Sequence, residues 1–370
     1  MTVIVIEFCI VILGMALTAV LFHRFPVLPD PTGEITETPS ISVIIPARNE
    51  EKNLALILRD LSVQTQAVRE IIVVDDMSED GTARVAREHG AKLIRLEDKP
   101  EGWTGKTWAC QSGADAAEGE TFLFLDADVR LGKNGIRSLV EAFRKAGCTI
   151  SVQPYHRTEK LYEQFSMMFN LIQIAANGTS LPKPLDIGLY GPVIFISRSD
   201  YGKIGGHESV RQSVVEDMAL GTRLKEVGVP YRLFIGSPSI SFRMYAGGLR
   251  DLLHGWTKNI ASGAARIPLV LFAAVFFWIA SLLSVPIQII KFSASRNGPW
   301  LLIYCALYVL WVIVLALLSR RVGRFQIWTI AFYPVLMLVM TGVFIVSAFR
   351  KLFGLKVKWK GRDIATGEKR

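Results

Sequence analysis

Apolar residues are concentrated at the two ends of this chain, and this segregation most limits what the chain can fold into. Residues 2–22 are almost all apolar, with Glu7 as the only charge. Three further apolar runs occupy residues 268–290, 300–318 and 326–349. Each run is close to the roughly 20 residues that a membrane-spanning helix needs. We therefore expect an N-terminal membrane anchor at 1–25 and C-terminal membrane helices at 266–349.

Composition supports a membrane protein and excludes several other classes. Hydrophobic residues make up 51% of the chain and the mean hydropathy is +0.34. These values do not fit a disordered chain, a disulfide scaffold or a collagen-like fibre. The first apolar run lacks both the basic start and the small-residue cleavage site of a signal peptide. The 4 cysteines form no CxxC pair and the 5 histidines are scattered, so we expect free thiols and no cysteine–histidine metal site.

Part of the formal net charge of +9 comes from basic residues that lie beside the apolar runs. Residues 350–370 form a basic tail in which eight basic residues face two acidic ones, a net charge of +6. Basic patches can bind nucleic acid, but next to apolar helices they are more simply explained by retention at an anionic cytoplasmic leaflet. We therefore expect a multi-pass protein of the cell membrane, with a cytoplasmic middle domain and no nucleic-acid partner.

A cytoplasmic middle domain and a cytoplasmic tail require an even number of membrane crossings between them, yet three apolar runs lie there. One run is therefore expected to be re-entrant or interfacial. Pro268 and Pro286 bracket the first run and Pro334 interrupts the third, and proline disrupts a continuous helix. Both runs remain candidates.

The middle of the chain, residues 40–265, alternates β-branched runs with amphipathic segments. We expect strands at 41–45, 71–74, 92–96, 122–125 and 149–153. We expect helices at 50–63 (capped by Asn49), 82–89, 105–117 and 136–145. This alternation predicts right-handed βαβ units on a mostly parallel sheet. Ligands bind such sheets beyond the carboxyl ends of the strands, so the residues that follow each strand matter most.

Acidic residues recur at those strand ends. The relevant segments are Pro46-Ala-Arg-Asn-Glu50, Asp75-Asp-Met-Ser-Glu-Asp-Gly-Thr82, Asp126-Ala-Asp128 and, further on, Glu216-Asp217. Each alone could be a turn or a helix-start acid. Together they would repel one another unless a cation or a hydrogen-bonding ligand lies among them. Because Asp126 and Asp128 close an apolar strand, they suit Mg²⁺ or Mn²⁺ bound with the oxygens of a diphosphate.

In this order and combination, the motifs resemble those of glycosyltransferase family 2, the GT-A nucleotide-sugar transferases, over about residues 40–260. The resemblance implies an α/β, Rossmann-like mixed sheet, mostly parallel, with helices on both faces, flanked here by transmembrane helices. It implies a metal at Asp128 and a catalytic base at Asp217. It also implies that the nucleotide sugar is held by Pro46, Ala47, Arg48, Glu50, Asp76, Asp126 and Ala127.

The segment Gly102-Trp-Thr-Gly-Lys-Thr-Trp-Ala109 is similar to a subgroup that contains membrane-bound carotenoid-acid (diaponeurosporenoate) and hopanoid-associated glycosyltransferases. This resemblance implies an inverting transfer of a hexose, glucose being expected, from a UDP-sugar to a lipid acceptor such as a carotenoid acid. Polyprenyl phosphate and ceramide-type lipids are alternative acceptors. A non-catalytic membrane scaffold that binds a nucleotide sugar is an alternative from another class, although such a scaffold has no need of Asp217.

Several further residues have both a functional and a structural interpretation. Many membrane-bound members carry a Q-x-x-R-W motif, but here Gly255 stands where arginine would precede Trp256. Which cation neutralises the departing diphosphate is therefore open, with Lys258 and Arg250 as candidates. Lys106 is either a phosphate contact or a solvated surface lysine.

Three residues are predicted to lie on the acceptor or diphosphate side of the site. We place Trp256 there, together with His207 and Glu216. His207 could equally be a hydrogen-bonded loop histidine, and Glu216 could orient a neighbour or face solvent. Met and Phe side chains at helical spacing in 160–181 suit either a protein core or a helix that docks at the membrane interface.

Overall fold

The computed structural model describes residues 2–29, 31, 38–264, 266–353, 355–359 and 362–365. The described chain divides into two compact units. One unit comprises residues 1–25, 157–185 and 247–349, and the other comprises 26–156, 186–246 and 350–370. The expected domain bounds of 40–265 and 266–349 differ from this division, because residues 157–185 and 247–265 group with the membrane helices. Part of the predicted basic tail, including Lys369 and Arg370, lies outside the described residues.

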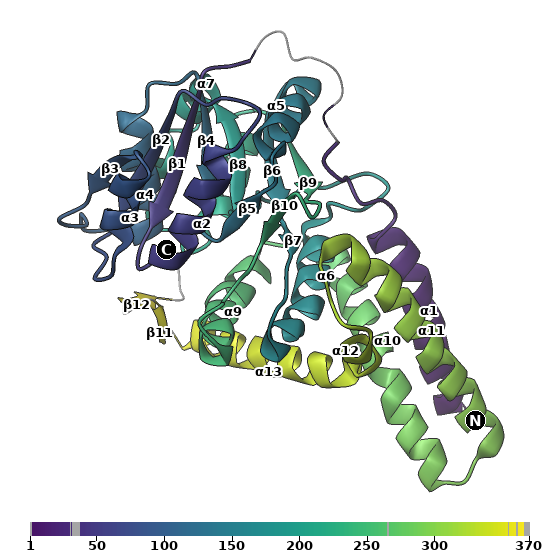
Figure 1. Ribbon diagram of the computed structural model, residues 1–370. Helices are drawn as coiled ribbons and strands as arrows, with labels where there is room; N and C mark the ends of the chain where they lie inside the picture. The colour runs from purple at the N-terminus through teal and green to yellow at the C-terminus, as the bar shows by residue number, and fades with distance from the viewer. Residues whose placement is uncertain are drawn as a thin grey trace. The chain divides into compact units, whose positions relative to one another are not determined.

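A mixed β-sheet organises the second unit (Figure 1). Its strand order is β3-β2-β1-β4-β8-β6-β9. The strands are β1 (Ile41–Ala47), β2 (Glu70–Asp75), β3 (Lys92–Arg95), β4 (Thr121–Leu125), β6 (Thr149–Gln153), β8 (Val193–Ser197) and β9 (Tyr231–Ile235). Only β8 among these described strands runs antiparallel to its neighbours, β4 and β6. The predicted mostly parallel sheet is thus confirmed, and the antiparallel β8 is an addition that strand–helix alternation does not reveal.

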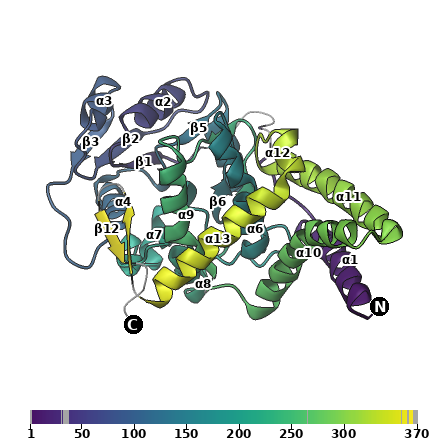
Figure 2. The same ribbon diagram turned by 90° about the horizontal axis from the view of Figure 1, so that it is seen from below.

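Helices cover both faces of this sheet, as Figure 2 shows for α2 and α3 on one face and α4 and α7 on the other. The helices are α2 (Glu51–Ser62), α3 (Thr82–Glu88), α4 (Gly105–Ala116), α5 (Gly135–Ala146), α7 (Arg198–Lys203) and α8 (Glu216–Glu226). Alternation along β1 explains the two faces. Val43 and Ile45 pack with α2, α3 and α5 in one core cluster, whereas Ile44 faces Gly113 of α4.

A second, three-stranded sheet lies beside the residues that follow β4. It consists of β5 (Val129–Leu131), β10 (Ile240–Phe242) and β7 (Tyr155–His156). β10 pairs antiparallel with β5, and Phe242 lies opposite Val129. This pairing brings the segment after Phe242 next to the Asp126–Asp128 turn, which lies more than 100 positions earlier in the chain.

The predicted cap of α2 is wrong. The helix begins at Glu51, and Asn49 adopts a left-handed backbone conformation with φ of 53°. Asparagine tolerates this region better than most residues. The Asn49 side-chain oxygen instead accepts a hydrogen bond from the backbone N–H of Glu79 at 2.9 Å. Asn49 therefore joins two loops of the site rather than ending a helix.

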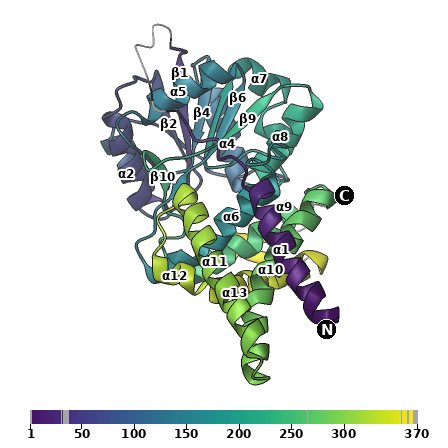
Figure 3. The ribbon, with the colours of Figure 1, turned by 90° about the vertical axis from the view of Figure 1, so that its right-hand side faces the viewer.

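The first unit contains four described helices that are long and apolar enough to cross a membrane. They are α1 (Thr2–Leu21), α10 (Leu269–Ala294), α11 (Gly298–Val322) and α13 (Tyr333–Leu352). Figure 3 shows α1 running beside α10. The third predicted C-terminal run is divided into a short α12 (Ile327–Ala331) and α13, just before Pro334. The chain is thus a membrane protein by its helices.

Polar contacts fix the packing of α1 on α10. The indole N–H of Trp278 donates to the Thr18 hydroxyl at 3.0 Å, and both side chains are buried. Lys291 pairs with Glu7 at 3.3 Å. Such a pair offsets the high cost of charge near a membrane. The same unit holds α6 (Ser166–Asn177), which packs on α10 and α11, the short 3-10 helix Leu161–Phe165, and α9 (Leu249–Ala264).

Close packing of α4 on the sheet depends on Gly113. A Cβ there would lie 2.5 Å from Cγ2 of Ile44 and 3.1 Å from Cγ2 of Val74. We expect Gly113→Ala to lower the free energy of unfolding by about 1–3 kcal/mol through overpacking, against the roughly 1 kcal/mol that alanine gains over glycine within a helix. Chemical unfolding of the purified protein in detergent measures the difference.

Gly202→Ala in α7 is the matched control, since no heavy atom lies within 4 Å of its added Cβ. We expect it to be neutral or stabilising. Equal stability of Gly113→Ala and Gly202→Ala would contradict the packing argument.

Candidate functional site

The loops after β1 and β2 are joined into one surface at the carboxyl edge of the sheet. The backbone N–H of Asp76 donates to the carbonyl of Ala47 at 2.8 Å. The Arg48 guanidinium donates to the carbonyls of Asp76 at 2.8 Å and Met77 at 3.4 Å. Pro46 pairs with Val74 in the parallel ladder. The predicted nucleotide-binding residues of these two loops are therefore neighbours in space.

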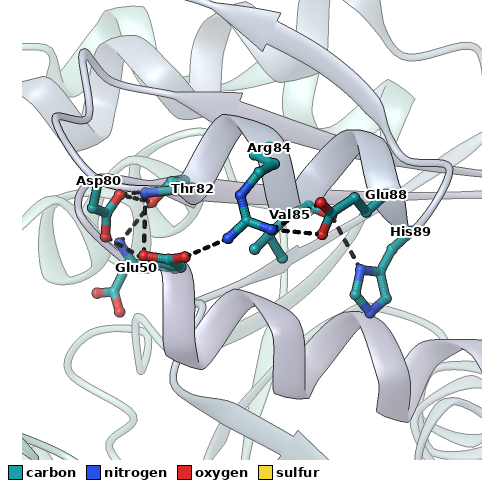
Figure 4. A network of polar contacts seen from close by, with 9 residues as sticks. Glu50, Asp80, Thr82, Arg84, Val85, Glu88 and His89 are labelled. Atoms are coloured by element: carbon teal, nitrogen blue, oxygen red, sulfur yellow. Dashed lines mark hydrogen bonds and ion pairs between the residues drawn. The ribbon is translucent and has the colours of Figure 1, made fainter.

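Glu50 stands immediately before α2, where its backbone N–H donates to the Thr82 hydroxyl at 2.9 Å. Its carboxylate accepts a hydrogen bond from the Asn53 side chain at 2.7 Å. Figure 4 shows Glu50, Asp80 and Thr82 gathered at one end of a polar network that continues through Arg84 to Glu88. These contacts fix the start of α2 to the start of α3.

Asp75 is the last residue of β2, and Asp76 follows it. Asp75 is 1% exposed, and its carboxylate accepts the backbone N–H of Ser78 at 2.9 Å while its other oxygen lies 3.5 Å from Arg95 Nε. This arrangement closes the turn. Asp76 is also buried, at 5% exposed, and its main-chain N–H and carbonyl contact Ala47 and Arg48. A cavity of about 470 Å³ adjoins this loop, lined by Met77, Ser78, Glu79, Arg95, Leu96 and Glu97.

Lys106 connects the D-x-D motif with the Glu216-Asp217 pair. Its ammonium nitrogen lies 2.7 Å from Asp126 Oδ1 and 3.0 Å from Glu216 Oε1. Burial disfavours the charged ammonium, but Asp126 and Glu216 raise the pKa of Lys106 well above its ordinary value. Lys106, whose side chain is 35% exposed, is thus a charged bridge between Asp126 and Glu216.

The start of α4, the helix that carries Lys106, is held in place by hydrogen bonds. Thr104 and Thr107 form a reciprocal capping box. The backbone N–H of Thr104 and the hydroxyl of Thr107 both donate to the carbonyl of Arg211, at 2.8 and 2.9 Å. The segment that leads into α8 is thereby tied to the helix that carries Lys106.

Asp217 occupies the first turn of α8, and its carboxylate accepts two backbone hydrogen bonds. The N–H of Gly191 donates to Oδ2 at 2.9 Å and the N–H of Met218 to Oδ1 at 2.8 Å. Burial and the neighbouring Glu216 raise the pKa of Asp217 to about 6, against the lowering effect of Lys106 and of these two N–H groups. A carboxylate with this pKa is ionised at neutral pH and can accept a proton.

The D-x-D turn itself places Ala127 in the core, 4% exposed, between two carboxylates at the end of β4. The backbone N–H of Val129 donates to the carbonyl of Asp126 and closes the turn. Sequence analysis missed Tyr245, which lies close by. Burial, with the charges of Asp128 and Asp126, raises the pKa of the Tyr245 phenol. The β5–β10 pairing brings Tyr245 near these aspartates, and no local sequence pattern predicts that pairing.

His207 and Trp256 lie in packed surroundings. His207 is 2% exposed, its Nδ1 is 2.8 Å from the Tyr201 hydroxyl, and its ring packs edge-on against Phe124. Burial lowers its pKa to about 3, so the imidazole is neutral, as in a hydrogen-bonded structural histidine. Trp256 belongs to the membrane unit, where its ring stacks on that of Phe169 with centroids 3.5 Å apart. Arg250 and Lys258 belong to that unit too.

Comparisons with known proteins agree with this geometry. The family model for glycosyl transferase family 2 matches residues 42–205. Two proteins named 4,4'-diaponeurosporenoate glycosyltransferase, from Staphylococcus aureus strains bovine RF122 / ET3-1 and MRSA252, are each 34% identical over 96% of this chain and 96% of their own length.

A solved mannosyltransferase from Pyrobaculum calidifontis, in complex with GDP-Man and Mn²⁺, has the same fold. It aligns with a TM-score of 0.54 and 17% identity, over 93% of this chain and 99% of that one. With the motifs, the fold and relatives that match along almost the whole chain, this protein belongs to glycosyl transferase family 2 and is a glycosyltransferase.

Proposed function

We propose that this protein transfers a hexose, with inversion, from a UDP-sugar to a lipid carboxylic acid of the carotenoid-acid type. The observation that supports the proposal is the ion-pair bridge from Asp126 through Lys106 to Glu216, the residue next to the proposed base Asp217. The names of the relatives in Staphylococcus aureus support a carotenoid acid as acceptor. The four apolar helices support a substrate that stays in the bilayer.

In this proposal the donor lies across the carboxyl edge of the sheet. Pro46, Ala47, Arg48 and Asp76 form the surface for the nucleoside, with Glu50 at its border. Asp126, Ala127 and Lys106 lie at the diphosphate. Lys106 is the cation proposed to face the departing diphosphate, since it pairs with Asp126. Arg250 and Lys258, the candidates from the sequence, belong to the membrane unit.

The transfer exchanges one bond for another at the sugar C1. The acceptor oxygen forms a bond to C1 as the bond from C1 to the diphosphate oxygen breaks, and its electron pair leaves with the nucleoside diphosphate. Asp217 takes the proton of an acceptor that enters as a protonated acid or an alcohol. If the acid enters as an anion, no proton moves, and Asp217 balances the positive charge that develops at the sugar.

Asp126 and Asp128 suit a hard divalent cation such as Mg²⁺ or Mn²⁺. Within the described residues, no group of three or more His, Cys, Asp or Glu side chains is arranged to hold a metal. The two carboxylates at the end of β4 suit an ion that takes its other ligands from a diphosphate and from water, as Mg²⁺ usually does. When bound, the ion stabilises the charge that grows on the leaving diphosphate.

The catalytic unit is proposed to be cytoplasmic, and the protein to span the cell membrane several times. The basic residues Arg320, Arg321 and Arg324 at the end of α11, together with the basic tail, support this orientation. Polyprenyl phosphate and ceramide-type lipids remain second candidates for the acceptor, since the membrane helices suit them equally.

The metal proposal predicts that transfer requires a divalent cation. We expect EDTA to abolish transfer and added Mn²⁺ or Mg²⁺ to restore it. Asp128→Asn should lose most turnover, because a neutral amide is a poorer ligand for a hard dication. Asp200→Asn is the control: Asp200 lies in α7, which follows Ser197 opposite Thr121, at the far end of β4 from Asp126. Full transfer in EDTA would refute the proposal.

The base proposal predicts how the rate depends on pH. Below about pH 6 Asp217 becomes protonated and kcat/KM should fall. Glu216 raises the pKa of Asp217, so Glu216→Gln should move this fall to lower pH. Lys106 lowers that pKa, so Lys106→Met should move the fall to higher pH. Asp217→Asn should reduce transfer to an alcohol or protonated acid by roughly 10²–10⁴-fold, with binding of UDP retained in calorimetry.

The two variants should move the pH at which kcat/KM falls in opposite directions. Each variant will also lower the maximal rate, but only the position of the fall reports the charge near Asp217. A fall that stays at one pH in both variants, or parental transfer to an alcohol acceptor by Asp217→Asn, would show that Asp217 is not the base.

A further inference from the structure

Residues Tyr190, Gly191 and Pro192 form a short main-chain segment directly before β8 that touches both halves of the site. The N–H of Gly191 donates to Asp217 Oδ2 at 2.9 Å. The next residue, Pro192, accepts a hydrogen bond from the backbone N–H of Asp126 at 3.0 Å. A chain of two residues therefore connects the D-x-D turn with the base through backbone groups alone.

The third residue of the segment anchors it in the core. The N–H of Tyr190 donates to the Ser151 hydroxyl at 2.7 Å, and that hydroxyl donates to the carbonyl of Tyr190 at 2.8 Å. Both side chains are fully buried. Ser151 lies in β6, an interior strand of the sheet between β8 and β9. The segment is thus fixed to the sheet by two hydrogen bonds to Ser151.

The Asp217 carboxylate occupies the space beside Gly191 in which a side chain would lie. A Cβ on Gly191 would lie 2.9 Å from Asp217 Oδ2 and 3.3 Å from its Cγ. The φ of Gly191 is not in the left-handed region, so glycine is needed there for space and not for backbone conformation. Nearby, a Cβ on Gly188 would lie 2.7 Å from Met218 Cα. The loop thus packs its bare backbone against the start of α8.

We infer that this segment is a brace that sets the position of the Asp217 carboxylate relative to the D-x-D motif, and that Gly191 is a positioning residue for the transfer reaction. The inference rests on the proposed role of Asp217 as the base. Backbone N–H groups held by a sheet cannot rotate away as side chains do. A displacement of about 1 Å in a reacting group can lower a rate by about 10²-fold, so a brace of this kind has a large effect on turnover.

The test is a double-mutant cycle on the purified full-length protein in detergent, with Gly191→Ala, Asp217→Asn and the double variant. We expect Gly191→Ala to lower kcat for transfer by about 10²-fold, because the added methyl group displaces the carboxylate. The KM for the UDP-sugar and the affinity for UDP should stay near parental values. In the Asp217→Asn background, Gly191→Ala should cause almost no further loss, because the group that it displaces no longer acts as a base.

Gly202→Ala serves as the matched control, with kcat at the parental value. Ser151→Ala provides a second variant that removes the anchor without adding atoms. It should lower kcat less than Gly191→Ala and should likewise have little effect in the Asp217→Asn background. This variant keeps the inference testable if Gly191→Ala does not fold.

The outcomes separate this inference from the function on which it rests. Near-parental kcat in both Gly191→Ala and Ser151→Ala, alongside a large loss in Asp217→Asn, would overturn the brace and leave the base intact. An equal loss from Gly191→Ala in both backgrounds would also overturn it, since glycine would then act through something other than Asp217. Parental transfer by Asp217→Asn would remove the base and the brace together.

Discussion

The ammonium group of Lys106 is the counter-charge on which the geometry of the site depends. Asp126 and Glu216 lie 90 positions apart in the sequence, yet both carboxylates contact the same ammonium group. Without that cation between them they would repel each other. The position of Lys106 depends in turn on α4, whose first turn is capped by Thr104 and tied to the carbonyl of Arg211. Gly113 lets the same helix lie close to β1. Local packing and long-range charge pairing therefore specify one arrangement.

Sequence reasoning placed the acidic residues at the sheet edge because strand ends follow from hydrophobic periodicity. Asp76, Asp126 and Asp128 each come directly after an apolar strand, and a mostly parallel sheet gathers such ends on one side. The same reasoning missed Gly191 and Tyr245. Gly191 matters through a backbone N–H and an absent side chain, which leave no pattern in residue types. Asn49 was assigned to a helix cap, but a tertiary contact with Glu79 determines its conformation.

For the membrane helices, existence and packing depend on different features of the sequence. Their existence could be predicted from apolar length alone, but their packing rests on a few polar contacts that length does not encode. Trp278 reaches Thr18, and a Cβ on Gly14 would lie within 2.2 Å of the Ser281 side chain, so small residues allow α1 and α10 to approach closely. The break between α12 and α13 agrees with the disruption expected near Pro334.

The central claim is the formation of a sugar ester on a lipid acid, and alkali lability of the product tests it most directly. Membranes that contain the protein are incubated with several labelled nucleotide sugars and a carotenoid acid, and the lipid extract is analysed by mass spectrometry before and after mild alkali. The account predicts labelled lipid with a UDP-hexose, one hexose unit heavier than the acid, whose sugar is released by alkali. Labelled lipid that survives alkali, or no labelled lipid with any donor, would contradict it.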